Sequence, residues 1–225
     1  MTQHAGDAPA RPAWLDHLAH DLRSPLAPLT SGIAMLRSGG LDAAQQAEIL
    51  TTMQRQIDAL AQLADDTADL LGRRSNGALA PAEMASLLDM VGVRVFRRFE
   101  EARVAFEGRP PAGSCTVACD ARSLVRLLAQ LALASAQIAG AGNRVIADAS
   151  SDAGGVTLRL MLADSVPDGA DEFAAIAARW SNPAAPHVTD AAMRDIVARH
   201  GAQIAALGDT PQGIALLMPP APAGD

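Results

Sequence analysis

The sequence contains no lysine and no tyrosine, and it is poor in aromatic residues. All 18 basic residues are arginine, and aromatic residues make up 3% of the 225 positions. The net charge is −7, whereas nucleic-acid-binding proteins usually present a basic face. We therefore expect no nucleic-acid partner.

Long hydrophobic runs are also missing. No uncharged apolar run approaches the ~18 residues that a membrane-spanning helix needs. The sequence does not open with the charged and then apolar segments of a secretory signal. These absences predict a cytoplasmic protein without a membrane span.

Only two cysteines are present, Cys115 and Cys119, and they lie four residues apart with no second pair and no histidine nearby. A structural zinc site takes about four ligands, so we expect no metal site. The spacing alone would permit a disulfide. Reduced, buried thiols are the favoured interpretation for a cytosolic protein.

Abundant alanine, 49 of 225 residues, favours helix, and two apolar runs with heptad spacing predict a helical hairpin over residues 13–72. A break at Gly39-Gly40 separates the runs. The first run is Leu15, Leu18, Leu22, Leu26, Leu29, Ile33 and Leu36, and the second is Leu50, Met53, Ile57, Leu60, Ala64, Thr67 and Leu71.

Two helices alone leave such seams half covered. A second copy would complete a four-helix bundle, so a homodimer is the favoured prediction. The alternative is that the seam packs on the rest of the same chain.

The remaining sequence predicts a second domain and three irregular segments. Residues 1–12 and 219–225 are expected to be a disordered lead-in and tail, and 73–80 a polar linker. Residues 81–218 mix strands and helices, which predicts a two-layer α/β sandwich and an α+β protein overall. Helices are expected from Pro81 to about 101 and over 121–139, 172–180 and 190–200, and strands over 104–107, 116–118, 144–149, 156–163, 202–207 and 214–218.

The first predicted helix contains the segment His20-Asp21-Leu22-Arg23-Ser24-Pro25-Leu26. His20 lies roughly 200° of helix rotation from the seam residues on either side, so it faces solvent. An exposed imidazole offers a neutral, nucleophilic nitrogen near pH 7. Asp21 could orient the ring or take its proton, and Ser24 lies one turn further on the same face.

This heptapeptide resembles the H-box of histidine kinases, the phosphoacceptor motif of their dimerisation and phosphotransfer domain. The resemblance implies that His20 is the phosphorylated residue and that Asp21 assists phosphotransfer. It implies that Ser24 acts in dephosphorylation of a partner response regulator. His17 falls outside the motif and is interpreted as a neighbour.

Residues 81–218 resemble the Bergerat-type ATP-binding domain of that family in layout, but the nucleotide motifs are degenerate. Gln130 and Ala134 stand where the family has two asparagines that hold Mg²⁺ and phosphate. Asp164 matches the adenine-binding aspartate, but Val166 replaces the glycine that follows it, and Asp190 lies where a glycine-rich lid is expected. The resemblance thus implies a vestigial pocket with no cofactor bound.

The overall pattern is most similar to the dimeric histidine phosphotransferases with a decayed nucleotide pocket. This implies a phosphorelay protein that exchanges a phosphoryl group at His20 with receiver domains of response regulators. An upstream histidine kinase is a further candidate partner. Two alternatives stay open: a divergent cytosolic histidine kinase that still uses ATP and Mg²⁺, and a non-catalytic pseudokinase adaptor or response-regulator phosphatase acting through Asp21 and Ser24.

Overall fold

The computed structural model describes residues 12–71 and 78–220 and divides the chain into two compact units. The first unit holds the two N-terminal helices together with residues 184–192. The second unit holds the other described residues. Residues 184–192, which the sequence predicts as part of the second domain, are thus grouped with the hairpin.

Parts of the three segments predicted to be irregular lie outside the described residues. Within the described ranges, no helix is long and apolar enough to cross a membrane. The residues outside the description are 1–11 of the lead-in, 72–77 around the linker and 221–225 of the tail.

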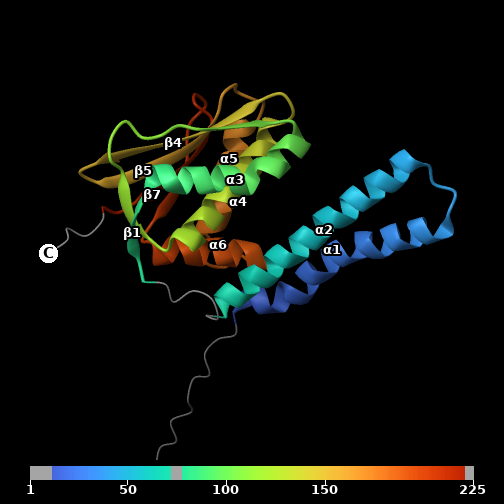
Figure 1. Cartoon of the computed structure of the whole chain (residues 1–225). Coiled ribbons are helices and arrows are strands. Elements are labelled where there is room, and N and C mark those ends of the chain that lie inside the picture. The colour runs from blue at the N-terminus through green and yellow to red at the C-terminus, as the bar shows by residue number, and fades with distance from the viewer. Residues whose placement is uncertain (1–11, 72–77, 221–225) are drawn as a thin grey trace, which may run out of the picture. The chain divides into compact units, whose positions relative to one another are not determined.

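The first unit is built on two helices, α1 (Ala13–Ser38) and α2 (Ala43–Leu70), which run antiparallel (Figure 1). Gly39 ends α1 with a φ of 72°, a region that glycine enters without the steric cost of a Cβ. Asp42 then begins α2 through a capping box. Its side chain accepts from the Gln45 N–H at 2.8 Å, and the Gln45 side chain accepts from the Asp42 N–H at 3.0 Å. The predicted hairpin is confirmed.

Much of the heptad seam is open to solvent. Six of its large apolar side chains are between 38% and 55% exposed, namely Leu22, Leu26, Ile33, Leu50, Ile57 and Leu71. Contiguous apolar surface of this kind marks interaction sites on soluble proteins. The hairpin therefore has a face left to cover, and the homodimer stays a prediction.

The other end of the seam is covered by the chain itself. Val188 and Ala191 pack with Trp14 and Leu63 in a buried cluster. The seam residues Leu15 and Leu18 and the nearby Leu70 pack against that cluster. At this end of the hairpin, the seam therefore packs against residues of the same chain, as the alternative prediction has it.

The second unit is a two-layer sandwich of sheet and helices, as predicted. Its main sheet has the order β2-β4-β5-β7-β6, with β2 and β4 parallel and the other pairs antiparallel. A separate two-stranded sheet pairs β1 with β3. The strands are β1 (Ala80–Glu83), β2 (Ala105–Gly108), β3 (Thr116–Cys119), β4 (Arg144–Asp152), β5 (Gly155–Leu162), β6 (Gln203–Ala206) and β7 (Gly213–Met218).

Helices cover this sheet (Figure 1). Helices α3 and α4 pack together, α3 against β2 and α4 against β4 and β5, while α5 packs against β6 and β7. The helices are α3 (Met84–Ala102), α4 (Ala121–Ala139), α5 (Gly169–Ser181) and α6 (Val188–Arg199). Helix α4 carries the centre of the core, because its leucines at 124, 127, 128 and 131 are at most 1% exposed.

One predicted boundary is wrong. The sequence predicts a helix from Pro81, but Pro81 lies in β1, and α3 begins at Met84. Pro81 pairs with Ala118 in the two-stranded sheet, where an edge strand tolerates the missing N–H of proline. Cys115 and Cys119 are both buried and are not joined by a disulfide in the structure.

The N-terminus of α4 is capped by Asp120, whose carboxylate accepts from the backbone N–H groups of Arg122 and Ser123. Partial burial acts to raise the pKa of Asp120, but the hydrogen bonds from Ser123 and Arg122 outweigh it. The pKa therefore lies below its ordinary value. The backbone N–H of Asp120 donates to Nε2 of the buried His200 at 3.1 Å, which ties the cap to the end of α6.

We expect Asp120→Ala to lower the free energy of unfolding by about 1 kcal/mol at neutral pH. Since folding lowers the pKa, the cap stabilises fully above the unfolded value near 3.9, and its contribution is lost as the pH falls through the lower folded value. Urea titrations should therefore show the wild-type advantage shrinking below about pH 4. An advantage of equal size at acid and neutral pH would contradict this role.

Candidate functional site

His20 projects from α1 into solvent. Its side chain is 72% exposed, whereas Trp14 and Pro25 on the same helix are buried. This exposure agrees with the helical spacing, which places His20 out of register with the seam. The ring is accessible to another protein.

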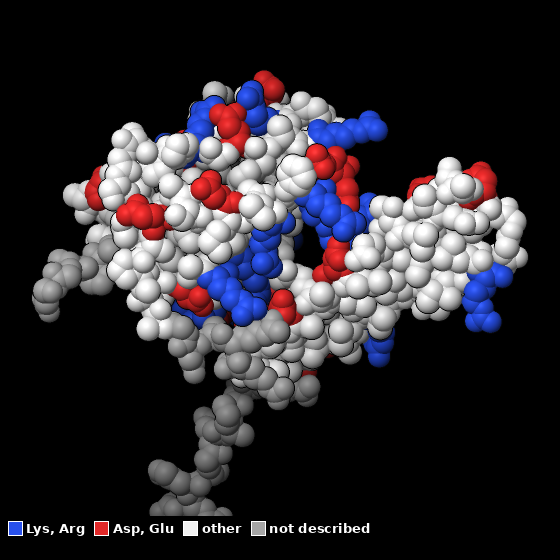
Figure 2. Space-filling model, viewed as in Figure 1, with Lys and Arg blue, Asp and Glu red and all other residues white. Residues whose placement is uncertain are grey.

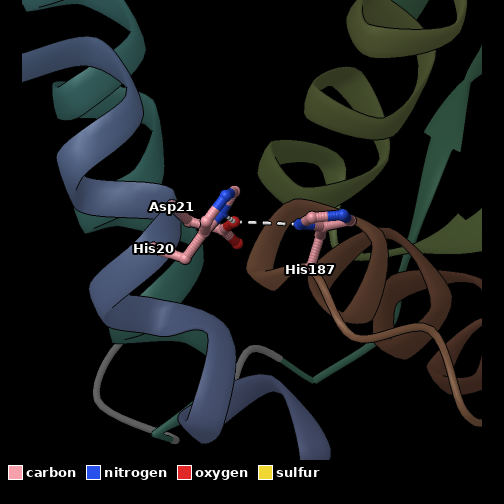
Figure 3. Close-up of side chains that lie close together, drawn as sticks. All are labelled: His20, Asp21 and His187. Atoms are coloured by element: carbon pink, nitrogen blue, oxygen red, sulfur yellow. Dashed lines mark hydrogen bonds and ion pairs between the residues drawn. The ribbon is translucent and has the colours of Figure 1, made fainter. Parts of the chain in front are cut away.

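Asp21 connects His20 to residues far along the chain (Figure 3). Its Oδ1 accepts from Nδ1 of His20 at 3.3 Å and from Nδ1 of His187 at 2.9 Å. Its Oδ2 accepts from the backbone N–H of Val188 at 3.0 Å. The Asp21 side chain is only 13% exposed. The three hydrogen bonds therefore fix the position of a largely buried carboxylate.

The charge on Asp21 sets the proton positions on both histidines. Partial burial acts to raise the pKa of Asp21, but the hydrogen bonds from Val188, His187 and His20 outweigh it, and the pKa lies below its ordinary value. The ionised carboxylate can only accept, so Nδ1 of each ring carries a proton. In the neutral ring with Nδ1 protonated, Nε2 of His20 carries the lone pair that a nucleophile needs.

Ser24 lies in the same hollow as His20. The hollow measures about 370 Å³, and Pro25, Gln56 and Ala59 also line it. Ser24 is one helical turn beyond His20 and exposed. Its hydroxyl can hold a water molecule or an incoming oxygen beside the imidazole. The fold thus brings His20, Asp21 and Ser24 together around one opening.

His187 and Thr189 complete this hollow, and the sequence does not predict either. His187 lies 166 residues from Asp21 in the chain, in a loop without periodicity. The one sequence signal is the helix predicted to start near 190, because an N-terminal amide needs an acceptor from outside the helix. The Thr189 hydroxyl donates to Oδ2 of the fully buried Asp66 at 2.7 Å, which anchors the segment on α2.

The residues of the predicted vestigial pocket lie in the second unit. Gln130 and Ala134 lie one turn apart on α4 and are half-buried, and Asp164 is exposed just beyond β5. Of these three side chains, Ala134 offers no oxygen, although magnesium requires oxygen ligands. Ala134 therefore cannot supply the metal ligand that an asparagine would offer at this position.

The loop after β5 is closed by Gln212. Its side-chain oxygen accepts from the Val166 N–H at 2.7 Å, and its nitrogen donates to the Val166 carbonyl at 2.9 Å. A Cβ at Gly169 would lie 2.6 Å from the Gln212 oxygen, so the side chain fills the space beside this loop. The sequence does not predict this contact, because nothing in the spacing links residue 212 to the loop.

Comparisons with known proteins identify the hairpin. Residues 10–71 match the His Kinase A (phospho-acceptor) domain. No curated protein matches the chain.

Solved structures with the same fold are histidine kinases. AdeS of Acinetobacter baumannii is similar with a TM-score of 0.61 and 14% identity, covering 89% of this chain and 97% of that chain. ThkA, solved in complex with the response regulator TrrA, gives a TM-score of 0.60 and 13% identity, covering 92% of this chain and 61% of its own. The hairpin thus matches a His Kinase A phospho-acceptor domain, and the chain shares its fold with these histidine kinases.

Proposed function

We propose that this protein is a histidine phosphotransferase of a two-component phosphorelay. His20 accepts a phosphoryl group from the aspartyl phosphate of one response regulator and donates it to the aspartate of another. The observation that carries this proposal is the His20 side chain, 72% exposed, whose Nδ1 lies 3.3 Å from Oδ1 of Asp21. The likeness in fold to ThkA, which was solved with a response regulator, supports receiver domains as partners.

The proposed transfer is an in-line displacement at phosphorus. The lone pair of His20 Nε2 forms the N–P bond while the bond from phosphorus to the aspartyl oxygen of the donor breaks, which frees that carboxylate. The ring gains positive charge, and the ionised Asp21 faces it through Nδ1. Transfer to the second regulator is the same displacement in reverse.

Ser24 is proposed to act in hydrolysis of the receiver's aspartyl phosphate. Its hydroxyl lines the hollow beside His20 and can orient a water molecule toward the aspartyl phosphate of a docked receiver. This assigns to Ser24 the phosphatase function that the H-box resemblance implies.

The relay is tested by following one labelled phosphoryl group through three proteins. A receiver domain that carries the label is first mixed with the chain and then removed by purification. The purified chain is next mixed with a second, unlabelled receiver domain. We expect label on the chain after the first step and on the second receiver after the next. Failure of every receiver encoded in the same genome to exchange label with the chain would contradict the proposal.

The proposed function uses no ATP. Ala134 lacks a metal ligand, Val166 occupies a glycine position, and Gln212 holds the loop closed. Helix α5 also packs its two large aromatic side chains inward, with Phe173 0% and Trp180 3% exposed. These features support the proposal that the second unit holds no magnesium ion and no triphosphate at these positions.

We therefore expect Mg-ATP to bind with a dissociation constant above about 1 mM, if calorimetry detects binding at all. The matched variant is Asp164→Ala, which removes the residue that corresponds to the adenine contact. It should behave like the wild type. Micromolar binding that Asp164→Ala abolishes would contradict the expectation.

A divergent histidine kinase is the second candidate function. It is favoured by the likeness in fold to the kinase AdeS across 89% of this chain, which includes the second unit, and by the presence of Asp164. This candidate requires transfer of the γ-phosphoryl group of ATP to His20, which the phosphotransferase does not perform.

A further inference from the structure

Three of the five histidines of the chain lie close together, with the rings of His17 and His20 each near that of His187. The ring centroids of His17 and His20 lie 5.9 Å and 6.3 Å from that of His187. One ligand atom from each of His20, Asp21 and His187 can be chosen so that all lie within 4.8 Å of one another. Two imidazoles and one carboxylate therefore converge from α1 and the loop before α6 (Figure 3).

We propose that His20, Asp21 and His187 form a binding site for a divalent transition-metal ion of the zinc type. Imidazole nitrogens and carboxylate oxygens are the ligands that zinc and cobalt accept in proteins. Three protein ligands with a water molecule in the fourth position is the usual composition of an open zinc site. The sequence does not predict this site, because His187 lies 166 residues from Asp21 in the chain.

The spacing of the donor atoms fits such an ion. A tetrahedral zinc ion with bonds of about 2.0–2.1 Å holds its donor atoms roughly 3.3 Å apart. Oδ1 of Asp21 lies 3.3 Å from Nδ1 of His20 and 2.9 Å from Nδ1 of His187. The remaining pair, one nitrogen each of His20 and His187, lies within 4.8 Å, so an ion that replaces the shared hydrogen bonds would draw the two rings together.

Two of the proposed ligands are positioned by hydrogen bonds from groups that would not themselves bind the ion. The Val188 N–H donates to Oδ2 of Asp21 at 3.0 Å, which leaves Oδ1 for the metal. The loop that carries His187 is anchored by the 2.7 Å bond from Thr189 to the buried Asp66. Such outer contacts fix ligand orientation and raise metal affinity.

Occupancy of the site would stop phosphorylation of His20. A metal ion on Nδ1 displaces the proton, which moves to Nε2 of the neutral ring. Nε2 then carries an N–H in place of its lone pair, so it cannot form a bond to phosphorus. This second part of the inference rests on the proposed phosphotransferase function, whereas metal binding does not.

Binding is tested on untagged protein by calorimetry with zinc chloride and by visible absorption with cobalt chloride. We expect one ion per chain, a cobalt d–d band, and a loss of affinity of at least about tenfold in His187→Ala. His187 is half exposed, so the variant should fold, and circular dichroism verifies this. Magnesium chloride should not compete, because Mg²⁺ prefers oxygen ligands. Gln56 lines the same hollow but is not one of the three proposed ligands, so the control Gln56→Ala should bind as the wild type does.

Equal zinc affinity in the wild type and His187→Ala, or no binding to either, would overturn the site. The effect on function is measured as the ratio of His20 labelling with and without zinc, using a phosphorylated receiver. The ratio should fall in the wild type and stay near one in His187→Ala, which also controls for zinc acting on the receiver. An unchanged wild-type ratio at saturating zinc would overturn the inhibition. Absence of labelling without zinc would instead contradict the proposed function, and calorimetry would still decide the metal site.

Discussion

Replacing His20 by alanine is expected to abolish labelling of the chain by a phosphorylated receiver domain. The reason is that Nε2 of His20 is the nucleophile that forms the N–P bond. Because the side chain is 72% exposed, the loss of stability should stay within about 0.5 kcal/mol. Labelling is measured by gel autoradiography, and the unfolding transition of the variant shows that the fold is intact.

His17→Ala is the matched control for this experiment. His17 lies one turn before His20 on α1, is exposed as well, and stands outside the H-box segment. The His17→Ala variant should be labelled to the same extent as the wild type. In both proteins the label should be acid-labile, since a phosphoramidate hydrolyses once its nitrogen is protonated. Label that persists in His20→Ala and disappears in His17→Ala would show that His17 is the phosphoacceptor, and would contradict the assignment to His20.

Ile57→Glu is expected to convert a dimer into monomers. Ile57 belongs to the heptad seam and is 49% exposed in a single chain, so a glutamate there is tolerated by the hairpin alone. In a four-helix bundle of two copies, the same carboxylate would be buried without a partner, which costs several kcal/mol in each copy. Sedimentation velocity at micromolar concentration distinguishes the two states.

Val93→Glu provides the control for a new charge on an exposed apolar site. Val93 lies on α3 of the second unit and is 82% exposed, so this variant should remain dimeric. Leu60 is less useful for the test, because it is already half-buried within one hairpin and its replacement would disturb the hairpin itself. A wild-type chain that sediments as a monomer at micromolar concentration would contradict the bundle.

The hairpin and the exposure of His20 could be predicted from sequence because both follow from helical periodicity. The spacing of Leu15, Leu18 and Leu22 defines a seam, and His20 lies out of register with it. Strand β1 was not predictable in this way. It has four residues, too few for periodicity, and Pro81 is as suitable for the first turn of a helix as for an edge strand.

The partners of the candidate site depend on contacts between distant parts of the chain. His187 reaches Asp21 across 166 residues, and Gln212 reaches Val166 across 46. Local propensity carries no information about either pair. The H-box segment predicts which residues act, but only the fold shows that Asp21 also binds the first amide of α6.

The central claim is that the phosphoryl group on His20 comes from a receiver domain and not from ATP. The most direct measurement compares two donors under the same conditions: γ-labelled ATP with magnesium, and a receiver domain carrying labelled aspartyl phosphate. The proposed function predicts label on the wild-type chain from the receiver only, and none on His20→Ala. Label transferred to His20 from ATP in the absence of any other protein would contradict it.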